Sequence, residues 1–196
     1  MTLASLSALD QFSIAGFPPG YSPVTRTFWS PVDDVHGALV ALAKSATLSL
    51  VVAMYGFDDE ELAQVLHDKI DQPGVFVQLS LDSSQAGGTH EKALLAKNDY
   101  PATSIAYGQS ERHAIMHLKV LIVDGMFLVT GSTNWSTGGE SKQDNQLTIS
   151  ADPLACAQAR SRVDAIHDSM LQQMAAKAAA VNTQAALSLV TGMVTA

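Results

Sequence analysis

The stretch from residue 117 to residue 134, HLKVLIVDGMFLVTGSTN, combines a predicted β-hairpin with several polar side chains that can bind or react with a ligand. Residues 117–123 and 126–130 are apolar runs, and the Asp124-Gly125 pair between them is typical of a tight hairpin turn. Residues two positions apart in a strand share one face of the sheet, about 7 Å apart, so His117 and Lys119 can act on one ligand. The same His-x-Lys spacing at 67/69 and 90/92 lies in helical patterns, where the two side chains diverge.

Outward from this hairpin, the apolar pattern predicts a mixed α/β fold. Strands are expected at residues 47–55, 75–81, 104–107 and 146–150, and helices from Pro31, after Asp58-Asp59, at 90–97 and from Pro153. Strands that alternate with helices and then form a hairpin indicate a mixed β-sheet flanked by helices on both faces. We predict an irregular N-terminal segment at residues 1–27, a main domain at 28–174, and an Ala-rich helical tail at 175–196.

Composition limits the classes of protein that this chain can represent. With 196 residues, 47% of them hydrophobic and 15% charged, it can bury one core and does not resemble a disordered chain. Its single cysteine, Cys156, excludes an intramolecular disulfide. A net charge of −8 with only 11 Lys and Arg argues against a general polyanion binder, whose affinity rests on a basic face.

The two ends of the sequence bear on location. Residues 1–17 lack a basic residue ahead of their apolar positions, which is a poor pattern for a signal peptide, and residues 178–196 are too diluted by polar side chains for a transmembrane helix. We therefore expect a cytoplasmic protein without stable membrane insertion.

Six residues of the opening stretch stand at fixed spacings, His-x-Lys-x4-Asp-x6-Gly-Ser-x-Asn. This pattern resembles the signature of the phospholipase D superfamily. The segments at 53–57 (AMYGF) and 82–88, and the Asp144-Asn145 pair, are similar to segments of the small bacterial endonucleases of that superfamily. The resemblance covers residues 28–174 and implies that this region is a phospholipase D-like catalytic domain.

The resemblance implies a role for each motif residue. His117, an imidazole that is largely neutral near pH 7, attacks phosphorus and forms a phosphohistidine. Lys119, Ser132 and Asn134 stabilise the phosphoryl oxygens, and Asp144 orients the imidazole, with Glu140 as the alternative acid. The structural motif residues are Asp124 and Gly131, and the candidate substrate contacts are Arg112, His113, Trp135, Glu140 and Lys142. No metal or other cofactor is expected, because no His, Cys and carboxylate cluster stands at ligand spacing in the sequence.

The chain carries one copy of the motif, whereas the superfamily reaction needs a second acid or base. The resemblance therefore implies a homodimer in which His117 and Lys119 of both chains face each other. Our leading hypothesis is a metal-independent endonuclease that cleaves DNA or RNA and prefers single strands. The alternatives are a phospholipid hydrolase or transferase, and a non-catalytic dimeric binding or assembly protein. A regulatory protein partner is also possible at the C-terminal helix.

Overall fold

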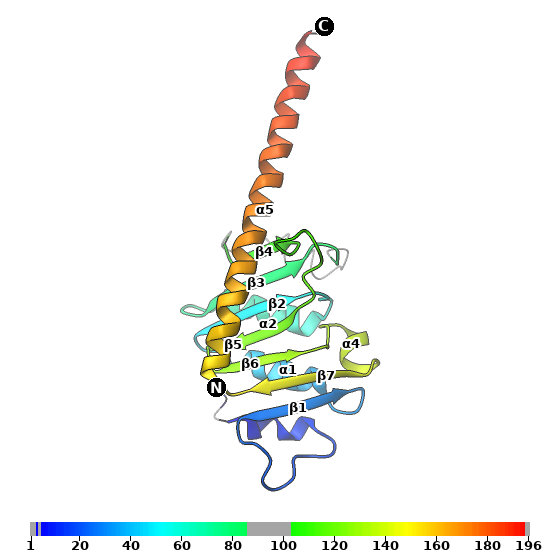
Figure 1. Ribbon diagram of the computed structural model, residues 1–196, viewed down its shortest axis with the longest axis vertical. Coiled ribbons are helices and arrows are strands. Elements are labelled where there is room, and N and C mark those ends of the chain that lie inside the picture. Colours follow the sequence, from blue (N-terminus) through cyan, green and yellow to red (C-terminus); the bar gives the residue numbers. More distant parts are fainter. Residues whose placement is uncertain (1–2, 4, 86–102, 195–196) are drawn as a thin grey trace.

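A seven-stranded mixed β-sheet forms the centre of the protein (Figure 1). The computed structural model describes residue 3, residues 5–85 and residues 103–194, with side chains described as far as residue 184. The spatial strand order is β1-β7-β6-β5-β2-β3-β4, where β2, β3 and β4 run parallel and β5 pairs antiparallel with β2. The strands are β1 (Thr25–Ser30), β2 (Ser49–Met54), β3 (Phe76–Asp82), β4 (Ile105–Gly108), β5 (Lys119–Val123), β6 (Phe127–Gly131) and β7 (Asn145–Ser150).

Helices cover both faces of this sheet, as the sequence predicts. On one face lie the 3-10 helix η1 (Leu6–Phe12), α1 (Val35–Lys44) and α2 (Glu60–Ile70), and their apolar side chains form the larger core. On the other face α5 (Pro153–Val194) packs Cys156, Val163 and Met170 against β2, β4 and β5. The short α4 (Thr137–Ser141) links β6 to β7. Aspartates cap two of these helices, because Asp34 accepts from Gly37 N and Asp59 accepts from Leu62 N.

The N-terminal segment is more regular than the sequence indicates. It contains η1 and contributes β1, which pairs antiparallel with β7 and forms one edge of the sheet. The helix predicted from Pro31 begins only at Val35, because Asp33 binds the backbone N–H groups of Trp29 and Ile14 and holds a loop there. The first hairpin strand begins at Lys119 rather than His117. The helix predicted at 90–97 lies outside the described residues.

The C-terminal helix extends far beyond the body of the molecule (Figure 1). Its first part packs against the sheet, whereas the side chains at positions 175–184 are all exposed. In the part of the chain that the structure describes, none of the helices is long and apolar enough to cross a membrane. The division of the chain into three segments stays a prediction.

Asp124 fastens the end of β5 to the start of β2. Its carboxylate accepts from Leu48 N and Ser49 N, both at 2.8 Å, and from the backbone N–H and hydroxyl of Thr47. Partial burial by itself would raise the pKa of Asp124, but the hydrogen bonds from Ser49, Leu48 and Thr47 outweigh it, and the net pKa is lowered. Asp124 thus stabilises the fold at the end of β5 that lies opposite His117.

We expect Asp124→Asn to lower the free energy of unfolding by about 2 kcal/mol, because the uncharged amide cannot accept the same set of bonds. Asparagine tolerates the positive φ of 54° at this position, so the loss reports the carboxylate rather than the backbone. Urea denaturation at pH 7 measures it, with exposed Asp168→Asn as the control. Since the pKa is lowered, the difference from wild type should shrink as the pH falls through the ordinary range of a carboxyl group. Equal stability of the two variants would contradict this role.

Candidate active site at one edge of the sheet

His117 and Lys119 lie together where β5 begins, beside the end of β2. The register pairs Lys119 with Met54, and Tyr55 N donates to Leu118 O at 2.9 Å. Lys119 Nζ lies 2.9 Å from His117 Nε2 and 3.1 Å from the His117 carbonyl oxygen. The imidazole is exposed, whereas Lys119 is only 6% exposed. The strand thus holds the two groups at contact distance on an open edge.

The ring of Tyr55 completes this pair. Its centroid lies 4.5 Å from the imidazole centroid of His117 and 4.9 Å from Lys119 Nζ. Burial lowers the pKa of Lys119, because the charged ammonium group is poorly hydrated there. When Nζ donates to Nε2, the Nε2 lone pair is directed at Nζ and the proton of the neutral ring is on Nδ1. In this tautomer Nε2 carries the lone pair that nucleophilic attack uses once Nζ turns to an anionic ligand.

Ser132 fixes the loop that follows β6. Its hydroxyl donates to Asn145 Oδ1 at 2.8 Å and accepts from Gln146 N, and its own N–H donates to Gln146 O. Both of its donors are therefore engaged within the chain, which makes Ser132 a positioning residue here. Gly131 allows this close approach, because a Cβ on it would stand 2.0 Å from Gln146 O.

Asn134 reaches the same edge from the loop between β6 and α4. Its Oδ1 is buried without a hydrogen-bond partner among the described residues. Its amide packs against Gly56, where an added Cβ would lie 3.1 Å from Asn134 Cγ. It helps to line a cavity of about 380 Å³, whose other walls are Gly56, Phe57, Asp58, Ser84, Gln85 and Ser136. Because Gln85 Nε2 donates to Tyr55 Oη at 3.0 Å, the cavity adjoins the site.

Several predicted contacts do not reach the imidazole. Asp144 is exposed, and the described residues include no hydrogen bond between it and His117; its neighbour Asn145 makes the contact with Ser132. Glu140 is buried against His36 and Asp59. Trp135 is 1% exposed and packs edge-to-face with Phe57 at 5.5 Å, so it is a core residue that cannot stack on a base.

The remaining candidates are exposed side chains close to the motif in sequence. Arg112 and His113 precede His117 in a loop that Asp82 holds by accepting from Met116 N at 2.6 Å. Lys142 follows α4 and is exposed too. Asp82 and Tyr55 are further positioning residues that the sequence does not reveal individually, although Tyr55 ends one predicted strand and Asp82 directly follows another.

A second polar cluster joins α1, α2 and α4. His36 Nδ1 lies 2.8 Å from both Asp59 Oδ2 and Glu140 Oε2, and His36 Nε2 lies 3.1 Å from Glu61. One ligand atom from each of His36, Asp59 and Glu140 falls within 4.8 Å of the others, so these side chains could hold a divalent cation. The sequence does not reveal this group because its members are more than 20 residues apart.

Burial by itself would lower the pKa of His36, but the hydrogen bonds to Glu61 and Glu140 outweigh it and raise the pKa to about 9. Burial, reinforced by Asp59, raises the pKa of Glu140 to about 8. The folded protein therefore keeps protons that the unfolded chain releases at lower pH.

From these raised pKa values we expect stability to fall as the pH rises. The contribution of His36 to the free energy of unfolding is fully present below its ordinary pKa of 6.5 and is lost as the pH passes about 9. After allowance for the partial exposure of His36, we expect a loss of about 1 kcal/mol between pH 6.5 and 9.5, measured by urea denaturation without added metal. His36→Asn combined with Glu140→Gln should flatten the profile, because both groups with raised pKa values are then gone, whereas His113→Asn in an exposed loop should not. A wild-type profile that is flat over this range would contradict the expectation.

Comparison with known proteins agrees with the fold. Residues 39–167 match the family described as cardiolipin synthase, PLD-like domain. A mitochondrial cardiolipin hydrolase of Chlamydomonas reinhardtii is 28% identical over 130 residues, which cover 63% of this chain and 53% of that protein. The chain thus spans about half the length of this curated relative.

Two solved structures share the fold at 22% sequence identity. NucT from Helicobacter pylori has a TM-score of 0.65 and covers 74% of this chain and 96% of its own. Nuc from Salmonella typhimurium, a phospholipase D family member, has a TM-score of 0.62 and covers 74% and 94%. The family match spans well over half of the sequence, and the chain belongs to the phospholipase D-like family, a class of phosphodiesterases.

Proposed function

We propose that this protein is a metal-independent phosphodiesterase that cleaves nucleic acid through a phosphohistidine at His117. The observation that carries the proposal is the 2.9 Å contact between Lys119 Nζ and His117 Nε2 at the exposed start of β5. This contact supports the proposal because a nucleophile and a cation this close together can both act on one phosphate group without a metal ion.

In the proposed reaction, His117 Nε2 forms a bond to phosphorus while the bond from phosphorus to the leaving oxygen breaks. Lys119 Nζ and the Asn134 amide stabilise the phosphoryl oxygens during transfer. An acid protonates the leaving oxygen and then, as a base, takes a proton from water. The water oxygen bonds to phosphorus, the phosphorus–nitrogen bond breaks, and His117 is restored.

We infer that His117 of the partner subunit supplies this second acid and base in a homodimer. The motif occurs once in the chain, and His117 is exposed rather than covered by its own fold. Two apolar neighbours, Ile115 at 51% and Leu118 at 36%, are exposed beside it, which suits contact with a second copy.

Nucleic acid suits the cavity better than a lipid does. The cavity beside Tyr55 is lined mainly by polar side chains, among them Asp58, Ser84 and Asn134, and acyl chains favour apolar walls. The sequence resemblance to the small bacterial endonucleases points the same way. The cardiolipin hydrolase relative keeps a phosphatidyl diester as the second candidate substrate. Preference for single strands, a cytoplasmic location and a regulatory partner on α5 stay predictions.

We expect the protein to cleave single-stranded DNA or RNA in the presence of EDTA. His117→Ala should lower the rate by at least about 10³-fold, and Lys119→Met by about 10²-fold or more, because each removes a group that acts on the phosphate. His67→Ala, on the distant α2, is the control and should stay active. Parallel assays with duplex DNA and cardiolipin vesicles rank the substrates. Cleavage of cardiolipin alone would favour the lipid alternative, and no cleavage of any diester would favour a binding protein.

We also expect a dimer in solution, measured by light scattering after gel filtration. Leu118→Glu should produce monomers and lower activity by more than about 10-fold, because charges at an apolar contact repel each other. Leu48→Glu, just before β2 at the opposite ends of these strands, should leave both properties unchanged. A fully active monomer would contradict the shared site.

A further inference from the structure

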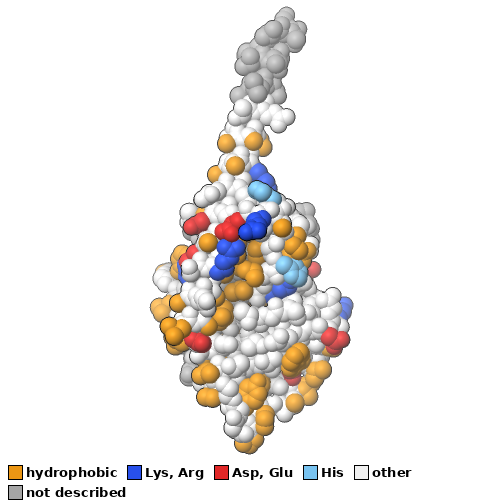
Figure 2. Space-filling view, viewed as in Figure 1, with side chains coloured by type: hydrophobic (Ala, Val, Ile, Leu, Met, Phe, Trp, Pro, Cys, Tyr) orange, Lys and Arg blue, Asp and Glu red, His pale blue; other side chains and the backbone are white. Residues whose placement is uncertain are grey.

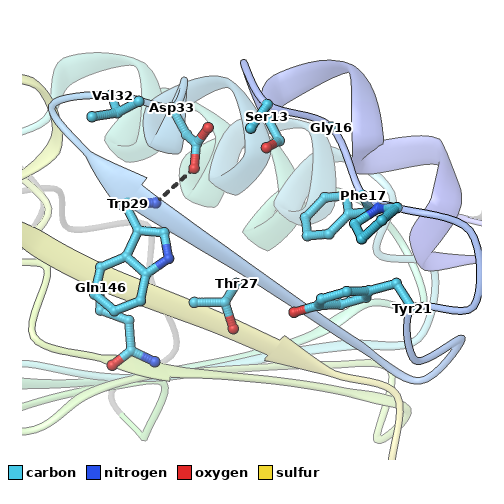
Figure 3. Close-up of a pocket in the computed structure, with 11 residues that line it drawn as sticks. Ser13, Gly16, Phe17, Tyr21, Thr27, Trp29, Val32, Asp33 and Gln146 are labelled. Carbon is cyan, nitrogen blue, oxygen red and sulfur yellow. Dashed lines mark hydrogen bonds between the residues drawn. The ribbon is translucent and has the colours of Figure 1, made fainter.

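An aromatic pocket of about 580 Å³ lies beside β1, under the N-terminal segment at residues 13–21 (Figure 3). Trp29 lies over the side chain of Gln146, and Tyr21 directs its hydroxyl toward Thr27. Trp29 is 56% exposed and Tyr21 38% exposed, which is unusual for rings of this size. In Figure 2, hydrophobic side chains also gather at the end of the body opposite the protruding helix.

The rings of this pocket are held in place by neighbours. Phe17 and Tyr21 lie 4.8 Å apart between centroids, and the guanidinium of Arg26 lies 4.7 Å from the Phe17 centroid. Arg26 is 6% exposed and forms an ion pair with Asp10, so it supports the rings and is not available to a ligand. The backbone N–H of Trp29 donates to Asp33 Oδ2 at 2.9 Å. The pocket is therefore built before any ligand arrives.

The lining of the pocket is electrically almost neutral. No lysine or arginine is among its lining residues, and its one carboxylate, Asp33, is engaged by the N–H groups of Trp29 and Ile14. Its other polar side chains, Ser13, Tyr21, Thr27 and Gln146, are neutral. Thr148 Oγ1 holds Thr27 Oγ1 and Gln146 Nε2, and Oε1 of Gln146 is left to accept from a ligand. Such a surface disfavours a phosphate and suits a planar, uncharged ring with hydrogen-bonding edges.

The pocket is continuous with the catalytic edge. Trp29 pairs with Gln146 in the β1–β7 register, and the backbone of Gln146 bonds to Ser132 in both directions. Three strand spacings, roughly 15 Å, separate Trp29 from β5, where Lys119 begins. Stacked nucleotides rise about 3.4 Å each, so this span corresponds to about four nucleotides. All its lining residues except Gln146 precede the family match at 39–167, so the pocket is an addition to the shared domain.

We propose that the aromatic pocket binds one unpaired base of a single-stranded nucleic acid whose scissile phosphate lies at His117. The base stacks on the indole of Trp29, and Oε1 of Gln146, whose Nε2 is held by Thr148, accepts a hydrogen bond from its edge. A base in a duplex is already paired and stacked, so the pocket selects single strands. This inference rests on the proposed nuclease function and adds a substrate-binding position to it.

The test uses the fluorescence of Trp29, because the other tryptophan, Trp135, is buried. In the His117→Ala background, which prevents cleavage, single-stranded oligonucleotides of eight nucleotides are titrated and the quenching is followed. Adding Trp29→Ala, with the oligonucleotide then labelled, should raise Kd about 10-fold, the usual effect of losing one stacked base. Trp29→Phe should stay within about threefold, because it retains a ring. Phe76→Ala removes an exposed aromatic residue at the far edge of the sheet and should leave Kd unchanged.

Activity separates this inference from the proposed function. Trp29→Ala in the otherwise unaltered protein should slow cleavage of the oligonucleotide but not of a short diester such as bis(p-nitrophenyl) phosphate, which cannot reach the pocket. Cleavage with an unchanged Kd for Trp29→Ala would overturn the base-binding role and leave the nuclease intact. Quenching by cardiolipin vesicles but not by oligonucleotides, or a shift in dimerisation alone, would also overturn it. If the unaltered protein binds oligonucleotides through Trp29 yet cleaves no diester in EDTA, the proposed nuclease function is wrong and the base-binding role of the aromatic pocket is retained.

Discussion

The antiparallel pairing of β5 with β2 is the constraint on which the site depends. It sets Lys119 opposite Met54 and brings Tyr55 against the imidazole of His117. All five residues of β5 are buried, so the register is fixed by packing on both faces of the sheet. A slip of one residue would direct Lys119 to the opposite face and away from the ring of Tyr55. Asp124 holds the other end of the same strand, about 17 Å from Lys119 along the chain.

Much of this arrangement could be predicted from local patterns. The apolar runs indicate every described strand except β1, and the strand spacing brings His117 and Lys119 to one face. The strand β1 escapes prediction because its residues, TRTFWS, gain their partners only from β7, more than 110 positions later. Helix α1 begins late because Asp33 binds Ile14, a contact that no local pattern announces.

The acidic partner of His117 also cannot be assigned from local sequence patterns. The family resemblance offers Asp144, with Glu140 as the alternative, as the partner of His117, but packing buries Glu140 beside His36 and leaves Asp144 exposed. Trp135, adjacent to Asn134, is held inside by Phe57. Which polar residues reach the site depends on how the loops pack against each other. Here the loops after β2 and β6 are joined by a hydrogen bond in which Trp135 N donates to Gly56 O at 3.0 Å.

The distribution of positive charge reconciles an acidic chain with an anionic substrate. In the part of the chain that the structure describes, Arg26, Lys44, Arg160 and Arg162 are neutralised by carboxylates. Lys119, Arg112 and Lys142 have no ion pair there, and neither do Lys69 and Lys177. The net charge of −8 thus limits general polyanion binding without removing cations from the proposed site.

The central claim is that His117 attacks phosphorus, and a trapped intermediate tests it most directly. Rapid acid-free quenching during turnover of a 5′- or 3′-labelled diester, followed by peptide mass spectrometry at alkaline pH, should reveal a phosphoryl adduct on His117 that is absent from His117→Ala. Turnover with no adduct on His117, or with the adduct on another residue, would contradict the account.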